Sequence, residues 1–108
     1  MKKTFWIAAI AIAAPTSLFA GQTIAELGPQ DRVTVSGVVD RIADEDTFIL
    51  RDHTGQIPVY LGPNMVPVAV GTAVTVHGIF DDDAPQEIYA NRMETDNGTS
   101  FSFDRTYE

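Results

Sequence analysis

The sequence predicts an all-β domain in which five strands close into a small Greek-key barrel. Two observations carry this prediction. Short runs of alternating apolar and polar residues recur along the chain, separated by glycine, proline and acidic turn residues. Two of these runs contain an internal glycine, Gly37 and Gly78, and such a glycine often marks a bend or bulge in a strand. One short helical turn is predicted ahead of the first strand.

Residues 1–20 have the three-part layout of a secretory signal peptide. Two lysines precede an uncharged apolar run at residues 5–14, and a proline and small residues follow it. We predict cleavage between Ala20 and Gly21 and a periplasmic location. The apolar run is short for a bilayer-spanning helix, so an uncleaved anchor is the less favoured alternative. No stable membrane insertion is expected after cleavage, and residues 21–108 are predicted to form a single domain.

The helical turn is predicted within residues 22–27. Thr23 and Glu26 have the spacing of a capping box, in which the glutamate reaches back to the backbone of the capping residue. Ile24 and Leu27 would be the apolar contacts of this turn. A flexible lead-in to the domain is the alternative.

The first strand is predicted over residues 33–40. Apolar and polar residues alternate up to Gly37, after which the pattern shifts by one position. This shift predicts a long strand with a bend at the glycine. An acidic turn follows, made of Asp44, Glu45 and Asp46.

Residues 48–61 predict a β-hairpin, because two apolar runs flank a polar turn that contains glycine. The positions predicted to face the core are Phe48, Leu50, Ile57, Val59 and Leu61. Arg51 and Tyr60 then fall on the opposite face. Asp52 begins the turn, where its side chain can accept hydrogen bonds from backbone N–H groups ahead of it. A positive φ angle is predicted at Gly55.

Three further segments complete the chain. Residues 62–67 are rich in glycine and proline, which predicts a connector without a long helix. A fourth strand is predicted over residues 73–80, and an acidic turn with Asp81, Asp82 and Asp83 follows it. The fifth strand is predicted over residues 87–95.

Two details of the C-terminal part depend on local geometry. Met93 joins the core face of the fifth strand only if that strand carries a bulge. The pair Asn97-Gly98 predicts a tight turn. Residues 97–108 are therefore predicted to form either a short extra strand or a frayed tail.

Five strands, two of them bent at glycine, with a connector between the third and fourth, follow the element order of the OB-fold. The segments VSGVV at residues 35–39 and TFILRDHTGQIPV at residues 47–59 resemble the bacterial OB-fold (BOF) family of small secreted periplasmic proteins. The resemblance covers residues 21–95. Anticodon-binding OB domains carry a similar hairpin turn, but the signal peptide and the acidic charge separate the two. The proline-rich connector and the aromatic tail depart from the family pattern.

Charge and composition narrow the function classes. After the predicted cleavage, 15 acidic residues face 5 arginines and no lysine. A surface this acidic repels phosphate backbones and favours cationic partners, so no nucleic-acid partner is expected. The absence of cysteine excludes disulfides, thiol chemistry and cysteine-based zinc sites. No catalytic motif occurs, so the sequence predicts neither an enzyme nor a cofactor.

The two acidic turns are candidate ligand-binding loops. In an OB-fold, the loop between strands one and two and the loop between strands four and five flank one binding face. The six carboxylates of these two loops would then lie toward one end of the barrel, around one binding face: Asp44, Glu45, Asp46, Asp81, Asp82 and Asp83. Divalent cations, cationic peptides and amine-bearing glycans fit this chemistry, although neither turn has a calcium-loop spacing. The alternative is two solvated turns that maintain solubility.

Arg51 and Tyr60 are the other candidate ligand contacts, on the exposed face of the hairpin. Tyr60 could stack on a ring and Arg51 could bind an anionic group. A surface cross-strand pair is the alternative.

The leading hypothesis is a non-enzymatic periplasmic OB-fold binding protein. The family resemblance implies a role in envelope stress tolerance. Three ligand classes fit this hypothesis: a cationic peptide, a peptidoglycan fragment and a divalent cation. One alternative is a single-stranded nucleic-acid-binding OB domain, and another is an interaction module that docks through a sheet edge.

Overall fold

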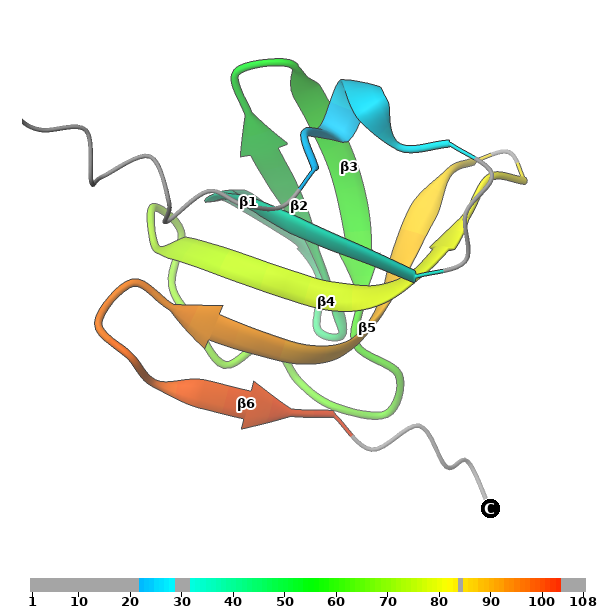
Figure 1. Ribbon diagram of the computed structural model, residues 1–108. Helices are drawn as coiled ribbons and strands as arrows, with labels where there is room; N and C mark the ends of the chain where they lie inside the picture. Colours follow the sequence, from blue (N-terminus) through cyan, green and yellow to red (C-terminus); the bar gives the residue numbers. More distant parts are fainter. Residues whose placement is uncertain (1–21, 29–31, 84, 104–108) are drawn as a thin grey trace, which may run out of the picture.

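The computed structural model describes residues 22–28, 32–83 and 85–103. One sheet with strand order β3-β2-β1-β4-β5-β6 contains all of the strands in this part of the chain, and β3 also pairs with β5. That parallel pairing closes the first five strands into a barrel, as predicted (Figure 1). The strands are β1 (Arg32–Asp44), β2 (Thr47–Asp52), β3 (Gly55–Tyr60), β4 (Ala73–Asp81), β5 (Glu87–Thr95) and β6 (Ser100–Ser102).

Strand β1 is longer than the predicted 33–40 because it pairs with two neighbours in succession. Its first half pairs with β4, and from Val38 onward it pairs with β2. Two register shifts interrupt the pairing of β1 with β2. They break the alternation of apolar and polar residues, so the continuation of the strand could not be predicted from that alternation. Gly37 packs closely against β2, since a Cβ there would lie 2.4 Å from the backbone oxygen of Arg51.

Strand β5 carries the bulge on which the burial of Met93 depends. The register between β4 and β5 shifts between His77 and Gly78, so that one residue of β5 is left over. A Cβ on Gly78 would lie 2.3 Å from the backbone oxygen of Tyr89. Met93 is fully buried, as the bulge requires.

The barrel interior is filled by the apolar positions of all five barrel strands. The five positions predicted from the hairpin are buried: Phe48, Leu50, Ile57, Val59 and Leu61. Tyr60 and Arg51 point outward, as alternation requires. Ile49 faces outward in the same pattern but is only 8% exposed.

The predicted helical turn is the 3-10 helix η2 (Ile24–Glu26). The backbone N–H of Thr23 donates to the Glu26 carboxylate at 2.9 Å, which is the reach-back of the predicted capping box. This bond lowers the pKa of Glu26. Ile24 and Leu27 pack against the core cluster. In Figure 1, η2 lies beside the β2–β3 turn.

The extra strand predicted in the tail is present as β6, which pairs with β5. Residues 104–108 and the predicted signal peptide lie outside the described residues. The connector at residues 61–72 contains turns and bends but no helix. No helix within the described ranges is long and apolar enough to cross a membrane.

Candidate functional site

Tyr60 and Tyr89 form an aromatic pair on the outer wall of the barrel. The parallel pairing of β3 with β5 sets them side by side, and their rings meet edge to face with centroids 5.6 Å apart. Their neighbours along the strands, Val59 and Ile88, are fully buried, so both tyrosines point outward. We call Tyr60 and Tyr89 the tyrosine pair.

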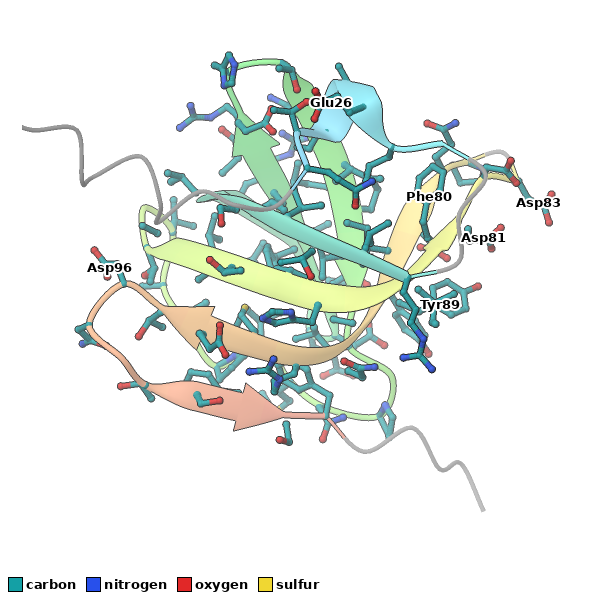
Figure 2. All side chains as sticks on the ribbon, viewed as in Figure 1. Glu26, Phe80, Asp81, Asp83, Tyr89 and Asp96 are labelled. Atoms are coloured by element: carbon teal, nitrogen blue, oxygen red, sulfur yellow. The ribbon has the colours of Figure 1, made fainter. Side chains whose placement is uncertain are left out.

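Two carboxylates at the ends of β4 and β5, those of Asp81 and Glu87, lie beside Tyr89. Glu87 faces Asp81 across the ladder. The charge of Glu87, together with partial burial and the charge of Asp81, raises the pKa of the Tyr89 hydroxyl. Figure 2 shows Tyr89, Asp81 and Asp83 on the same side of the molecule. An aromatic ring bordered by carboxylates suits a cationic group, since both attract positive charge.

The carboxylates of Asp81, Asp82 and Asp83 lie close together. Among the described residues, this is the one group of three whose ligand oxygens all lie within 4.8 Å of one another. The backbone N–H of Asp83 donates to the Asp81 carboxylate, so the shape of the turn accounts for part of this clustering. Asp82 and Asp83 are exposed.

The first acidic turn lies elsewhere, beside the connector between β3 and β4. Leu61 donates a backbone hydrogen bond to Asp46, and Val66 donates one to Glu45. Asp44 closes the turn locally by accepting a bond from the N–H of Glu45. A small cavity of about 170 Å³ separates Glu45 and Asp46 from residues 62–65.

The two acidic turns lie on either side of the tyrosine pair, and of their carboxylates only those of Asp81, Asp82 and Asp83 form a group of three with ligand oxygens within 4.8 Å of one another. The first turn follows the end of β1, whereas the start of β1 at Arg32 pairs with Ile79, two residues before Asp81. The 13 residues of β1 thus separate the two turns. The tyrosine pair lies between them, because Tyr60 also pairs with Thr47, the residue after the first turn.

Arg51 and Tyr60 both face outward, but they lie at opposite ends of the hairpin. Arg51 pairs with Gln56 at one end of the hairpin, and Tyr60 pairs with Thr47 at the other. Arg51 instead donates from Nε to the Asp40 carboxylate at 2.9 Å. This bond, assisted by a second one from Arg41, lowers the pKa of Asp40.

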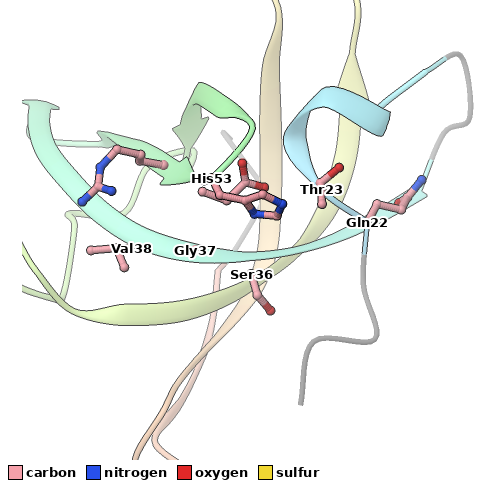
Figure 3. A pocket seen from close by; sticks show the side chains of 8 residues that line it. Gln22, Thr23, Ser36, Gly37, Val38 and His53 are labelled. Carbon is pink, nitrogen blue, oxygen red and sulfur yellow. The ribbon is translucent and has the colours of Figure 1, made fainter. Parts of the chain in front are cut away.

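A cavity of about 500 Å³ lies on the Arg51 side of the hairpin. Three segments line it: residues 22–23 before η2, residues 36–38 of β1, and residues 51–53 at the end of β2. Figure 3 shows Gln22 and Thr23 on one side of the opening, with Gly37 on the strand beneath. This cavity was not predicted from the sequence, because it depends on where the N-terminal segment packs.

Asp52 holds the N-terminal segment over this cavity. Its Oδ2 accepts a hydrogen bond from the N–H of Ile24 at 2.8 Å. Its Oδ1 accepts bonds from Thr54 and from the N–H of Gly55. The turn prediction for Asp52 is confirmed, but Gly55 does not have a positive φ angle, which among the glycines occurs at Gly62, Gly71 and Gly98.

Tyr89, Glu87 and Asp40 were not predicted from the sequence as members of these sites. Tyr89 stands between buried Ile88 and Ala90, so alternation marks it as outward-facing. Its place beside Tyr60 follows only from the parallel β3–β5 pairing, and that pairing joins segments far apart in the sequence.

Comparison with known structures supports the fold. The structure of the hypothetical protein YgiW from E. coli matches with a TM-score of 0.52 and 23% sequence identity, over 62% of this chain and 78% of that one. No protein-family model matches the sequence. No curated protein matches it significantly. The similarity to YgiW concerns the fold and leaves function to be argued from the sites.

Proposed function

We propose that the chain is a non-enzymatic periplasmic binding protein, related to the BOF family, that captures cationic peptides and contributes to envelope stress tolerance. The observation that carries the proposal is the tyrosine pair bordered by Glu87 and Asp81. The N-terminal layout of a signal peptide and the acidic charge of the remaining chain support the same reading.

The chemistry of this surface favours a ligand with several positive charges. A cation over an exposed aromatic ring contributes about 0.5–1 kcal/mol, and an exposed ion pair contributes about 0.2–1 kcal/mol. A single ammonium group would therefore bind weakly. A peptide with several lysines or arginines can contact the tyrosine pair and the carboxylates of Asp81, Asp82 and Asp83 together.

Calorimetric titration with a lysine-rich peptide tests the proposal, with a glutamate-rich peptide of equal length as the control. Binding of the lysine-rich peptide alone is expected, and it should weaken as salt rises. Replacing Tyr60 or Tyr89 by leucine should weaken binding about two- to five-fold, whereas phenylalanine should retain it.

A matched pair of charge variants locates the site. Glu87→Gln and Asp96→Asn remove the same charge, but Asp96 lies in the β5–β6 turn, away from Tyr89 in Figure 2. Only Glu87→Gln should weaken binding of the lysine-rich peptide. Equal effects of both variants would show that net charge alone drives the association, and the proposed site would then be wrong.

A divalent cation is a second candidate ligand, favoured by the proximity of Asp81, Asp82 and Asp83. Calcium prefers oxygen ligands, several of them carboxylates. Thermal unfolding in increasing calcium tests this role, because a ligand of the folded state raises the melting temperature. An unchanged melting temperature up to about 1 mM calcium would exclude a site of useful affinity.

Titration with a single-stranded oligonucleotide, beside the peptide and calcium titrations, tests the nucleic-acid alternative. The acidic charge of the chain opposes a phosphate backbone, which supports the peptide proposal over a nucleic-acid ligand. Tight, salt-sensitive binding of a single-stranded oligonucleotide would favour the nucleic-acid alternative over the peptide proposal.

A further inference from the structure

The cavity of about 500 Å³ lies at a gap in the edge of β1. Residues 32–38 of β1 pair with β4 on one side. On the other side, pairing with β2 begins only at Val38. On this second side, ahead of Val38, one isolated β-bridge occurs within the described residues, and it joins Gln22 to Val35. The cavity occupies the space that a longer β2 would otherwise fill, and its size is typical of small-molecule sites.

The lining of the cavity includes the apolar residues Gly37 and Val38 and two basic residues, Arg51 and His53. Gly37 lies on the strand beneath the opening (Figure 3), so we call the part of the lining formed by Gly37 and Val38 the floor, and Arg51 lines the cavity from the end of β2. Arg51 uses Nε for its bond to Asp40, and Nη1 and Nη2 make no ion pair or hydrogen bond within the described residues. A guanidinium with both terminal nitrogens available can bind a carboxylate through two parallel hydrogen bonds.

The acidic residue in the lining, Asp52, has its own hydrogen-bond donors. Asp52 already accepts hydrogen bonds from Ile24, Thr54 and Gly55, and these bonds use both of its oxygens. Arg41 adds a second positive charge to the ion-pair cluster around Asp40 without lining the cavity.

We propose that this cavity binds a small organic carboxylate with a flat apolar body. The body would rest on Gly37 and Val38, and the carboxylate would face Nη1 and Nη2 of Arg51. The site is separate from the tyrosine pair, since Arg51 and Tyr60 lie at opposite ends of the hairpin. The carboxylate site therefore goes beyond the proposed peptide-binding function, and either proposal can be wrong while the other is right.

Titration of the protein with benzoate tests this proposal, using protein isolated after expression of the full 108-residue chain. Benzamide has the same shape without the charge, and benzylamine reverses the charge. Nitrogen–proton NMR spectra should shift at residues 36–38 and 51–53 with benzoate. Benzamide should bind at least about five-fold more weakly, and benzylamine should bind more weakly still.

Two arginine variants provide the matched control. Arg51→Gln and Arg41→Gln each remove one of the two guanidinium groups that contact Asp40, but only Arg51 lines the cavity. Arg51→Gln should weaken benzoate binding about ten-fold, and Arg41→Gln should weaken it less than about two-fold. Val38→Trp, which fills the cavity from its floor, should abolish the shifts in a protein whose other resonances are unchanged.

Several outcomes would overturn the proposal. These are equal affinities for benzoate and benzamide, equal effects of the two arginine variants, or no shifts at residues 36–38 and 51–53 up to about 10 mM benzoate. Shifts confined to Tyr60 and Tyr89 would place the ligand on the peptide surface and would likewise contradict it.

Discussion

The carboxylate of Asp52 accepts a hydrogen bond from the backbone N–H of Ile24 at 2.8 Å, across 28 positions of sequence. The same side chain closes the β2–β3 turn through Thr54 and Gly55. Thr54 in turn accepts a bond from the N–H of Ala25 at 2.9 Å. One local turn therefore fixes both the hairpin and the N-terminal segment that covers the cavity.

We expect Asp52→Ala to destabilise the protein by about 1–2 kcal/mol, because it removes an acceptor of several backbone N–H groups. Hydrogen exchange at residues 24 and 25 should accelerate more than exchange in the core of β4. Chemical denaturation and exchange mass spectrometry measure the two effects. Asp96→Ala is the control, because Asp96 is exposed and its side chain makes no hydrogen bond within the described residues. Equal loss of stability in both variants would contradict the anchoring role.

Stability should fall as the solution becomes acidic, and Asp52 should account for part of the fall. Partial burial opposes ionisation of Asp52, but hydrogen bonds from Thr54, Ile24 and Gly55 outweigh it and lower its pKa below 3.8. The unfolded chain therefore binds a proton more readily than the folded protein. The stability contributed by ionised Asp52 is complete above about pH 5 and is lost as pH falls through the lowered folded pKa.

Urea denaturation between pH 7 and pH 3 measures this dependence. Asp52→Asn should show a shallower loss of stability than the parent chain over the acidic part of the range, since its amide does not titrate. Parallel curves for the two proteins would assign the acid sensitivity to other carboxylates, such as Asp40 and Glu94, whose pKa values are also lowered.

Two glycine substitutions should differ sharply although both lie in strands. A Cβ on Gly78 would lie 2.3 Å from the backbone oxygen of Tyr89, so Gly78→Ala must displace β5. A Cβ on Gly55 would meet only Ile24, at 3.6 Å, an ordinary contact. We expect Gly78→Ala to cost about 3 kcal/mol or more, and Gly55→Ala to change stability by less than about 1 kcal/mol. Thermal unfolding compares the two, and a costly Gly55→Ala would contradict the described packing.

The alternation pattern was sufficient to predict the barrel because each strand has one face in the core. Phe48 and Val59 could be assigned to the interior from their neighbours alone. The same rule failed where β1 changes partner, since the register shifts beyond Val39 break the alternation. The separate prediction of a positive φ angle at Gly55, made from its place in the turn, was wrong, because the side-chain bond from Asp52 shapes that turn without one.

The candidate sites were harder to predict because they depend on pairing between distant segments. Arg51 and Tyr60 were correctly placed on the outer face, but alternation does not show how far apart two outward positions lie along a hairpin. Tyr60 packs against Tyr89 of β5, and Arg51 forms an ion pair with Asp40 of β1. Neither pairing leaves a local signal in the sequence.

The tyrosine pair offers a last prediction that requires no ligand. The charge of Glu87 is the main cause of the raised pKa of Tyr89, with burial and Asp81 adding to it. Glu87→Gln should therefore lower the pKa of Tyr89 toward the ordinary value of 10.0. Asp96→Asn, which changes the net charge equally, should leave it nearly unchanged, because a distant exposed charge is screened by salt. Carbon NMR of labelled tyrosine rings follows each residue through the titration. If both variants shift Tyr89 equally, then the carboxylates do not border the ring as described, and the cation-binding surface proposed there loses its basis.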